Sequence, residues 1–299
     1  MSPAPNVEIF LEYQLMQNAQ AGKHNFLRLV SEALVEGGLQ PVFRRMSEAV
    51  DCNTAHSLIH MKAPASERGL VFRRAYHYPF WQIERTEKRG YWDVANTAFD
   101  PQTVNEVEAH NFARYWRNRL FPDVTASQGN HIYVPLQGKL LRRRSFQTIS
   151  PVNMLEAILA SATNPVVAAL HPNEDYTRAE TLALEKLAAK HTNLSVLTGE
   201  MMQHLPSCKL VVTQNSSVAF NQYFFSKPTI LFAEIDFHHI AVTSKNQPFA
   251  HAMDQALSAE PEFEKYLWWF WQDQSINAGK PNAREKIRAR LQKFGWPVA

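Results

Sequence analysis

Short apolar runs alternate regularly with segments of helical spacing between residues 131 and 233. Strands that are separated by helices pair in parallel through crossover connections, so this alternation predicts an α/β doubly wound sheet. The expected strands are 131–136, 165–170, 194–198, 209–213 and 228–233, and the expected helices are 151–162, 177–190, 200–206 and 217–225.

The beginning of the chain shows a shorter version of the same pattern. An apolar run at 7–13 is followed by a helical pattern at 24–36, by Gly37 and Gly38, and by a second apolar run at 41–44. Strand, helix, glycine stop and strand within about forty residues is typical of a βαβ unit. We therefore predict that the first half also opens as a Rossmann-type domain.

The rest of the first half is less regular. Further strands are predicted at 57–60 and 69–72, whereas the aromatic and charged stretch 73–100 has no clean period and is predicted to form loops across the face of the sheet. A helical segment at 105–119 precedes the polar, turn-forming stretch 121–130, which is the best linker in the sequence. We expect two domains, 1–125 and 126–299, the second ending in mostly helical structure from about residue 252.

Composition narrows the class of protein. The chain has 299 residues, is 45% hydrophobic and carries a formal net charge of only +3, which is typical of a folded protein and does not predict nucleic-acid binding. Two cysteines are too few for a disulfide framework, and no apolar run reaches the roughly 18 residues of a membrane helix. These features predict a cytoplasmic protein and leave peripheral contact with the inner membrane open.

Ligands of such sheets bind at the carboxyl ends of the strands, and one of these ends carries a histidine and a carboxylate. His171, Pro172 and Glu174 directly follow the expected strand 165–170, and the proline prevents the strand from continuing. The imidazole suits hydrogen bonding to a phosphate or nucleobase, or general acid catalysis. A histidine that caps the next helix or packs in a turn is the equally open structural alternative.

A second strand end carries hydroxyl and amide groups. Gln214, Asn215, Ser216 and Ser217 follow the strand 209–213 at the start of a helix, where free N–H groups and the helix dipole favour an anion. Ordinary N-capping by the serines accounts for the same residues. We expect this loop and the His171 loop to be neighbours and to converge on one anion.

A third loop, 137–147, follows the strand 131–136. Gly138 would permit close approach of the backbone to a ligand, and Lys139 with the three arginines 142–144 would neutralise phosphate or an acidic sugar. A solvated run of charge is the alternative for at least two of these arginines.

Together, four segments resemble the bacterial capsule polysaccharide synthesis family. They are 134–137, 171–172, 213–220 and 227–231, and the resemblance covers about residues 131–240. That family includes β-Kdo transferases with the two-domain GT-B architecture. It shares a His-Pro and paired-Ser donor site with several sialyltransferases that use CMP-sugars.

The resemblance implies an α/β, GT-B-like fold of two Rossmann-type domains with a helical C-terminal segment. Residues 1–125 would form the acceptor-side domain and 126–299 the nucleotide-sugar-binding domain. His171 and Pro172 would line the nucleotide pocket, and Ser216 and Ser217 would hold the donor phosphate. The remaining donor-side candidates are Gln137, Gly138, Glu174, Gln214 and Asn215.

One departure from the family concerns catalysis. The β-Kdo branch carries an Asp within a few residues of the strand 131–136, and 137–147 contains no acidic residue. A base or nucleophile would then come from elsewhere, and carboxylates are the usual choice for sugar chemistry. We select Glu84 and Asp93, together with His171, as candidate catalytic residues; a surface charge or a helix cap is the alternative for each carboxylate.

The leading hypothesis is a metal-independent glycosyltransferase without a cofactor. It would move a sugar from a nucleotide-sugar, with CMP weakly favoured, to a capsular or other cell-surface polysaccharide or a lipid-linked precursor. The alternatives are a non-catalytic binding protein with the nucleotide-sugar fold and an inverting transferase that uses a GDP- or UDP-sugar. Adjacent His238 and His239 point to opposite sides in an extended segment, so no metal is assigned to them.

Overall fold

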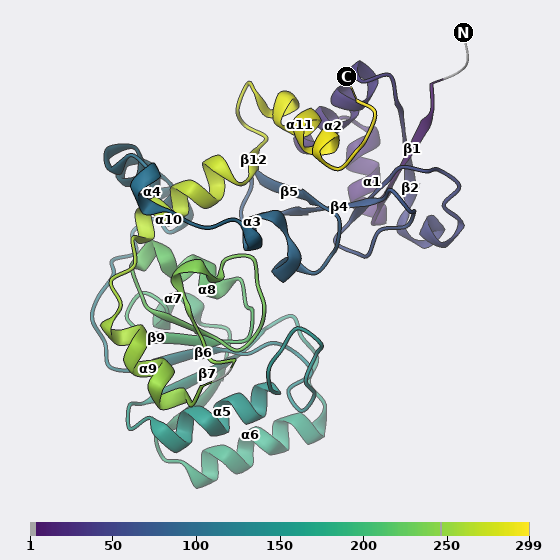
Figure 1. Ribbon diagram of the computed structural model, residues 1–299. Coiled ribbons are helices and arrows are strands. Elements are labelled where there is room, and N and C mark those ends of the chain that lie inside the picture. The colour runs from purple at the N-terminus through teal and green to yellow at the C-terminus, as the bar shows by residue number, and fades with distance from the viewer. Residues whose placement is uncertain (1–3, 246, 299) are drawn as a thin grey trace. The chain divides into compact units, whose positions relative to one another are not determined.

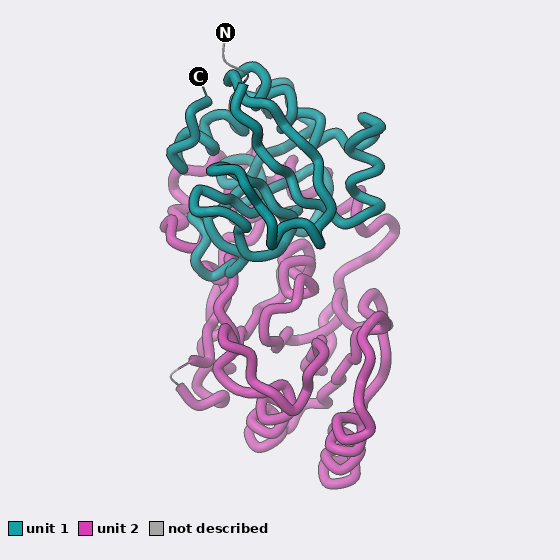
Figure 2. The backbone as a smooth tube through the Cα atoms, turned by 90° about the vertical axis from the view of Figure 1, so that its right-hand side faces the viewer, with its two compact units in different colours: residues 1–94, 270–299 teal, residues 95–269 magenta. Residues whose placement is uncertain are grey.

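The chain folds into two compact units, each built around one six-stranded sheet (Figures 1 and 2). The computed structural model describes residues 4–245 and 247–298. Unit 1 comprises Met1–Val94 and Phe270–Ala299, and unit 2 comprises Ala95–Trp269. This division differs from the expected boundary near residue 125. Residues 95–125 cluster with unit 2 because α4 (Glu106–Leu120) packs along α10 (Phe263–Trp268).

The sheet of unit 1 has the strand order β12-β5-β4-β3-β1-β2. Strands β1 and β2 are parallel and joined through α2 (Asn25–Glu36), as expected for a βαβ unit. The strands are β1 (Asn6–Leu11), β2 (Gln40–Arg45), β3 (Ser57–His60), β4 (Leu70–Arg74), β5 (Phe80–Glu84) and β12 (Ile276–Asn277). The other helices of unit 1 are α1 (Tyr13–Gln20) and α11 (Ala283–Lys293), and α3 (Asp93–Asn96) crosses the division between the two units.

Strand β5 lies within the stretch 73–100, for which the sequence predicted only loops, so that prediction was wrong. All five residues of β5 are buried. A strand that is covered on both faces lacks the alternation of polar and apolar residues that reveals a half-exposed strand. It pairs antiparallel with β4 and with β12, a strand from the far end of the chain, so its partners could not be read locally.

Helix α2 packs its apolar side chains into the core of unit 1. Its buried side chains recur at helical spacing, and each large one contributes about 1.5–3 kcal/mol on burial. The Nδ1 atom of His24 accepts a hydrogen bond from the Leu27 N–H at 3.2 Å and caps the first turn. Gly38, with φ of +79°, ends the helix. Helix α11 lies beside α2 (Figure 1).

The sheet of unit 2 is parallel throughout and has the order β11-β10-β9-β6-β7-β8. Its strands are β6 (Ile132–Pro135), β7 (Val166–Leu170), β8 (Leu194–Thr198), β9 (Leu210–Thr213), β10 (Thr229–Leu231) and β11 (Val242–Thr243). The helices, besides α4 and α10, are α5 (Pro151–Ser161), α6 (Arg178–Lys190), α7 (Met201–His204), α8 (Val218–Asn221) and α9 (Phe249–Ser258). The predicted alternation of strands and helices is therefore confirmed.

The aromatic cluster 267–271 is packed into the protein. Trp269, Phe270 and Trp271 are at most 3% exposed. Within unit 1, the ring of Trp271 stacks on Phe80 with centroids 4.3 Å apart, and its indole N–H donates to the Ala75 carbonyl at 2.9 Å. Within the described part of the chain, no helix has the length and apolar character needed to cross a membrane.

Candidate functional site

The strand order of unit 2 identifies one place where a ligand would bind. From β6 the chain moves outward through β7 to β8, and it then returns to the other side of β6 for β9, β10 and β11. The order thus reverses between β6 and β9. In open parallel sheets, ligands bind at the carboxyl ends of the strands beside such a switch point. The loops that follow β6, β7 and β9 all end at this edge.

After β6, Gly138 brings its loop close to the loop that follows β7. A β-carbon at Gly138 would overlap the Oε2 atom of Glu174. The carbonyl oxygen of Gly138 accepts a hydrogen bond from the Arg144 guanidinium, whereas Arg142 and Arg143 are exposed. The expected close neighbour of Gly138 was a ligand, and the structure places a carboxylate there instead.

His171 follows β7 directly and is exposed. Its backbone N–H donates to the Tyr176 hydroxyl at 2.8 Å, and its Nδ1 accepts from the Asn173 N–H at 3.2 Å. A neutral imidazole that accepts at Nδ1 carries its proton on Nε2. The ring therefore supports the turn through one nitrogen and presents an N–H donor at the other. Pro172 and Glu174 are exposed in the same loop.

In the loop after β9, most polar groups are buried. Gln214 is 1% exposed, and its Nε2 donates to the Ile149 carbonyl at 3.0 Å. The Oγ atom of Ser216 accepts from the Val218 N–H at 3.3 Å, so this serine caps the following turn. Asn215 is also buried, and Ser217 is exposed.

The helix that follows this loop is shorter than predicted. The expected helix 217–225 is α8, of four residues, followed by a 3₁₀ turn at Gln222–Phe225. A helix dipole is the sum of aligned peptide dipoles, so a single turn supplies little of it. Individual N–H and hydroxyl donors, rather than a helix dipole, are what this loop offers an anion.

The loops after β7 and β9 are not neighbours, contrary to the prediction. Strand β6 lies between them, and two strand spacings separate β7 from β9 by about 10 Å. Because all three strands are parallel, both loops still end at the same edge of the sheet. One small anion cannot bridge them, but a ligand as long as a nucleotide spans this distance.

Several buried polar atoms at this edge make no hydrogen bond within residues 4–245 and 247–298, among them two amide oxygens and one guanidinium nitrogen. These three are Gln137 Oε1, Arg144 Nε and Gln214 Oε1. Buried polar groups in folded proteins are nearly always paired, so unpaired ones at a sheet edge favour a polar ligand or bound water. Two acceptors and one cationic donor suit the base, ribose and phosphate groups of a nucleotide.

The two candidate carboxylates of unit 1 lie together. The Asp93 N–H donates to both carboxylate oxygens of Glu84, at 3.3 and 3.2 Å. Arg290 forms ion pairs with both residues, at 2.6 Å to Asp93, and Lys293 pairs with Asp93 at 2.6 Å. Sequence reasoning missed both cations because charges on a terminal helix are typical of a solvated face.

Burial dominates the electrostatics of this cluster. Glu84 is only 2% exposed, and its burial raises the pKa to about 7 against the opposing effect of Arg290. A carboxyl group with such a pKa exchanges a proton near neutral pH. Two other carboxylates of the chain have structural roles. Asp100 caps a 3₁₀ turn, and Glu234 pairs with Lys245 at 2.9 Å.

Comparisons with known proteins identify the fold. No protein-family model matches the sequence, and no curated protein matches it significantly. The β-Kdo 2,7 transferase of Thermosulfurimonas dismutans KpsC has a similar structure, with a TM-score of 0.55, 9% identity, and coverage of 97% of this chain and 99% of that one. The expected α/β, GT-B-like fold is confirmed.

Two further solved structures have lower TM-scores. The β-Kdo 2,4 transferase of the same KpsC has a TM-score of 0.48 and 9% identity, over 89% of this chain and 90% of that one. Staphylococcus aureus MnaA, in a co-structure with UDP, has a TM-score of 0.41 and 8% identity, over 97% of this chain and 96% of that one.

Proposed function

We propose that this protein is a glycosyltransferase that moves a sugar from a nucleotide-sugar to a capsular or other cell-surface polysaccharide or a lipid-linked precursor. The observation that carries the proposal is the set of polar loops at the switch point of unit 2. The fold that carries these loops is similar to that of a solved β-Kdo 2,7 transferase over 97% of this chain. In the proposal, unit 2 holds the donor and unit 1 receives the acceptor.

The proposed donor site uses the loops after β6, β7 and β9. His171 donates from Nε2 to a phosphate or base, and Pro172 keeps the strand from continuing past it. Gln137 and Gln214 supply buried amide oxygens for base or ribose hydrogens. Gly138 lets Glu174 approach, where a carboxylate suits the ribose hydroxyls.

Stabilisation of the leaving phosphate is assigned to protein donors. The hydroxyls of Ser216 and Ser217 lie at the end of β9, with Asn215 in the same loop. Arg144 lies in the loop after β6, where its guanidinium donates to the Gly138 carbonyl. Preorganised N–H and O–H donors that face developing negative charge are a major source of rate enhancement in such reactions. This arrangement needs no divalent ion. CMP-sugars are among the donors to be tested.

For proton transfer we propose His171, Glu84 and Asp93. Glu84, with its pKa near 7, exchanges a proton readily, and Asp93 is the more exposed of the two carboxylates. A non-catalytic binding protein is the second candidate. It is favoured by the absence of any acidic residue in 137–147 and by the pairing of Glu84 and Asp93 with two cations, Arg290 and Lys293.

The test is thermal unfolding of the full chain with CMP-, UDP- and GDP-sugars, followed by a search for product with the sugar that protects best. We expect at least one of them to raise the unfolding temperature and to lose this effect in His171→Ala and Ser216→Ala. His251→Ala and Ser258→Ala, on α9, are the matched controls. Protection without turnover would favour the binding protein, and indifference to every nucleotide-sugar would refute both candidates.

A further inference from the structure

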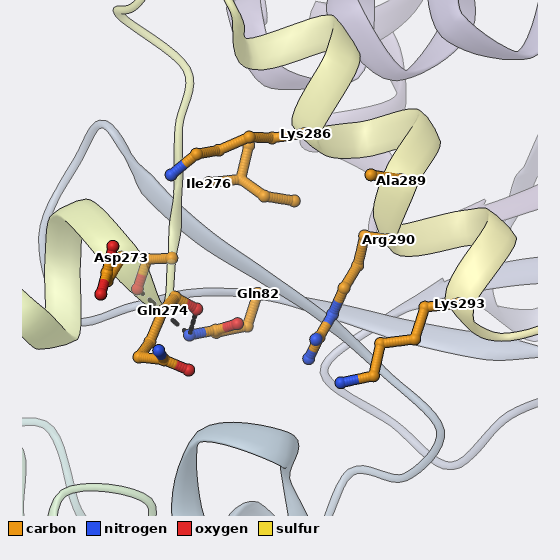
Figure 3. A pocket seen from close by; sticks show the side chains of 9 residues that line it. Gln82, Asp273, Gln274, Ile276, Lys286, Ala289, Arg290 and Lys293 are labelled. Atoms are coloured by element: carbon orange, nitrogen blue, oxygen red, sulfur yellow. Dashed lines mark hydrogen bonds between the residues drawn. The ribbon is translucent and has the colours of Figure 1, made fainter. Parts of the chain in front are cut away.

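A second polar pocket, of about 250 Å³, lies wholly within unit 1 (Figure 3). One wall is α11, which contributes Lys286, Arg290 and Lys293, one and two turns apart. The opposite side comes from Gln82 of β5 and from residues 273–276, which lead into β12. Arg290 and Lys293 extend into it side by side, and Gln82 lies between Gln274 and Arg290 (Figure 3). Nothing in the proposed donor site uses this pocket.

The three cations of the pocket differ in their partners. Arg290 is held by Glu84, Asp93 and the Ile83 carbonyl, and Lys293 by Asp93. Lys286 donates to the Gln272 carbonyl at 2.5 Å, but no carboxylate in residues 4–245 and 247–298 lies within 4.0 Å of its Nζ. The ammonium group of Lys286 thus has no ion pair within the described residues, although Asp273 lies farther away in the lining of the same pocket.

Burial makes that charge costly. Lys286 is half-buried, and loss of water around its ammonium lowers its pKa, with Asp273 acting in the opposite direction. A desolvated cation gains most from a ligand anion, because the interaction is screened less there than at the surface. The position of Lys286 therefore favours an oxyanion over a neutral ligand.

The remaining lining suits hydroxyl groups. Gln82 donates from Nε2 to the Gln274 carbonyl at 2.8 Å and to the Ser275 hydroxyl at 3.1 Å, so its amide is held in place. Asp273 and Gln274 add acceptors and donors. Ala289, between Lys286 and Arg290 on α11, is small and leaves room for a ligand ring. A ligand of this pocket would need several hydroxyls as well as its anionic group.

We propose that this pocket of unit 1 binds a small hydroxylated molecule that carries one oxyanion group, with Lys286 as the principal anion contact and Lys293 as a weaker one. The oxyanion is a carboxylate or a phosphate ester, which share this chemistry. Because Arg290 is already occupied by Glu84 and Asp93, it positions the wall of the pocket.

The test is isothermal titration calorimetry of the full chain with glucuronate, glucose 6-phosphate, inorganic phosphate and glucose. We expect one of the two anionic sugars to bind and glucose not to bind, and the tighter of the two assigns the oxyanion. Lys286→Met should weaken that binding by about tenfold or more, as expected for loss of a charge-assisted hydrogen bond. Lys286→Arg should retain most of it.

Lys280→Met, at an exposed lysine before α11, is the matched control and should leave the affinity unchanged. Lys293→Met, whose side chain is 57% exposed, provides a variant that folds even if Lys286→Met does not, and we expect about a threefold loss from it. The proposal is overturned if no anionic sugar binds, if glucose binds equally well, or if inorganic phosphate binds as tightly as the anionic sugars. Unchanged affinity in a folded Lys286→Met variant, or in Lys293→Met when that variant alone folds, would also overturn it.

Discussion

The carboxylate cluster of unit 1 and the sheet edge of unit 2 treat their polar groups in opposite ways. In unit 1, Glu84 and Asp93 both pair with Arg290, and Asp93 also pairs with Lys293, so two cations face two carboxylates. At the sheet edge, Gln137 and Gln214 bury amide oxygens that make no hydrogen bond within the described residues. In the first arrangement each of these charges has a partner of opposite sign in the protein, whereas the second leaves acceptors without a partner among the described residues. The comparison teaches that charge alone does not identify a binding site.

Removing the central cation should break the unit 1 cluster. Arg290→Met removes the cation that Glu84 and Asp93 share, and we expect a loss of about 3 kcal/mol in the free energy of unfolding, measured with urea well above the pKa of Glu84, where this buried carboxylate is ionised. Arg288→Met, which removes a partly exposed ion pair with Glu36 at 3.8 Å, should cost less than about 1 kcal/mol. Equal effects of the two substitutions would contradict the central place of Arg290 in the cluster.

The titration of Glu84 should make stability depend on pH. Because its pKa in the folded protein, about 7, lies above the ordinary value of 4.5, the folded state binds this proton more tightly than the unfolded chain. The resulting stabilisation, up to about 3 kcal/mol, is complete below the ordinary pKa and is lost as the pH rises through 7. Glu84→Gln should flatten this part of the profile in urea unfolding, and an unchanged profile would exclude Glu84 as its source.

Substitutions at the sheet edge should affect ligand binding and leave the fold intact. His171→Ala and Ser216→Ala each remove one donor to the nucleotide, for an expected loss of about tenfold in affinity for the protecting nucleotide-sugar. The unfolding temperature without ligand should stay close to that of the wild type, because His171 is exposed and Ser216 caps only one turn. A large loss of stability with unchanged affinity would show that these residues support the fold and do not bind the nucleotide.

Gly138 tests the contact between two of the loops, and its effect should be the smallest. In Gly138→Ala the new β-carbon displaces the Glu174 carboxylate, which is exposed and flexible, so stability should change by no more than about 0.5 kcal/mol. If Glu174 binds the ribose, the affinity for the nucleotide should fall about threefold in Gly138→Ala, and it should fall equally in Glu174→Ala. Affinities would be measured by titration calorimetry, and an unaltered affinity would show that Glu174 is not part of the site.

Sequence predicted unit 2 better than unit 1 for a physical reason. In unit 2, short apolar strands alternate with helices, and the pattern located β6 to β10 within a few residues. In unit 1, β5 is buried throughout and pairs with β12 from the other end of the chain, so neither periodicity nor proximity revealed it. The division between the units was missed because α4 packs on α10, more than a hundred residues away.

The candidate site was predictable only in part. Strand ends locate His171 and Gln214 at one edge of a parallel sheet, since every parallel strand ends there. The lateral order of the strands is set by long-range packing, so the position of β6 between β7 and β9 could not be predicted from the sequence. Arg290 also escaped notice, because its partners, Glu84 and Asp93, lie about two hundred residues earlier in the chain.

The central claim is that the carboxyl edge of the second sheet holds the donor nucleotide. Amide hydrogen exchange of the full chain, with and without the nucleotide-sugar that protects best against unfolding, tests it directly. We predict slower exchange confined in unit 2 to 137–147, 171–176 and 214–217. Protection that leaves all three loops unchanged would contradict the claim.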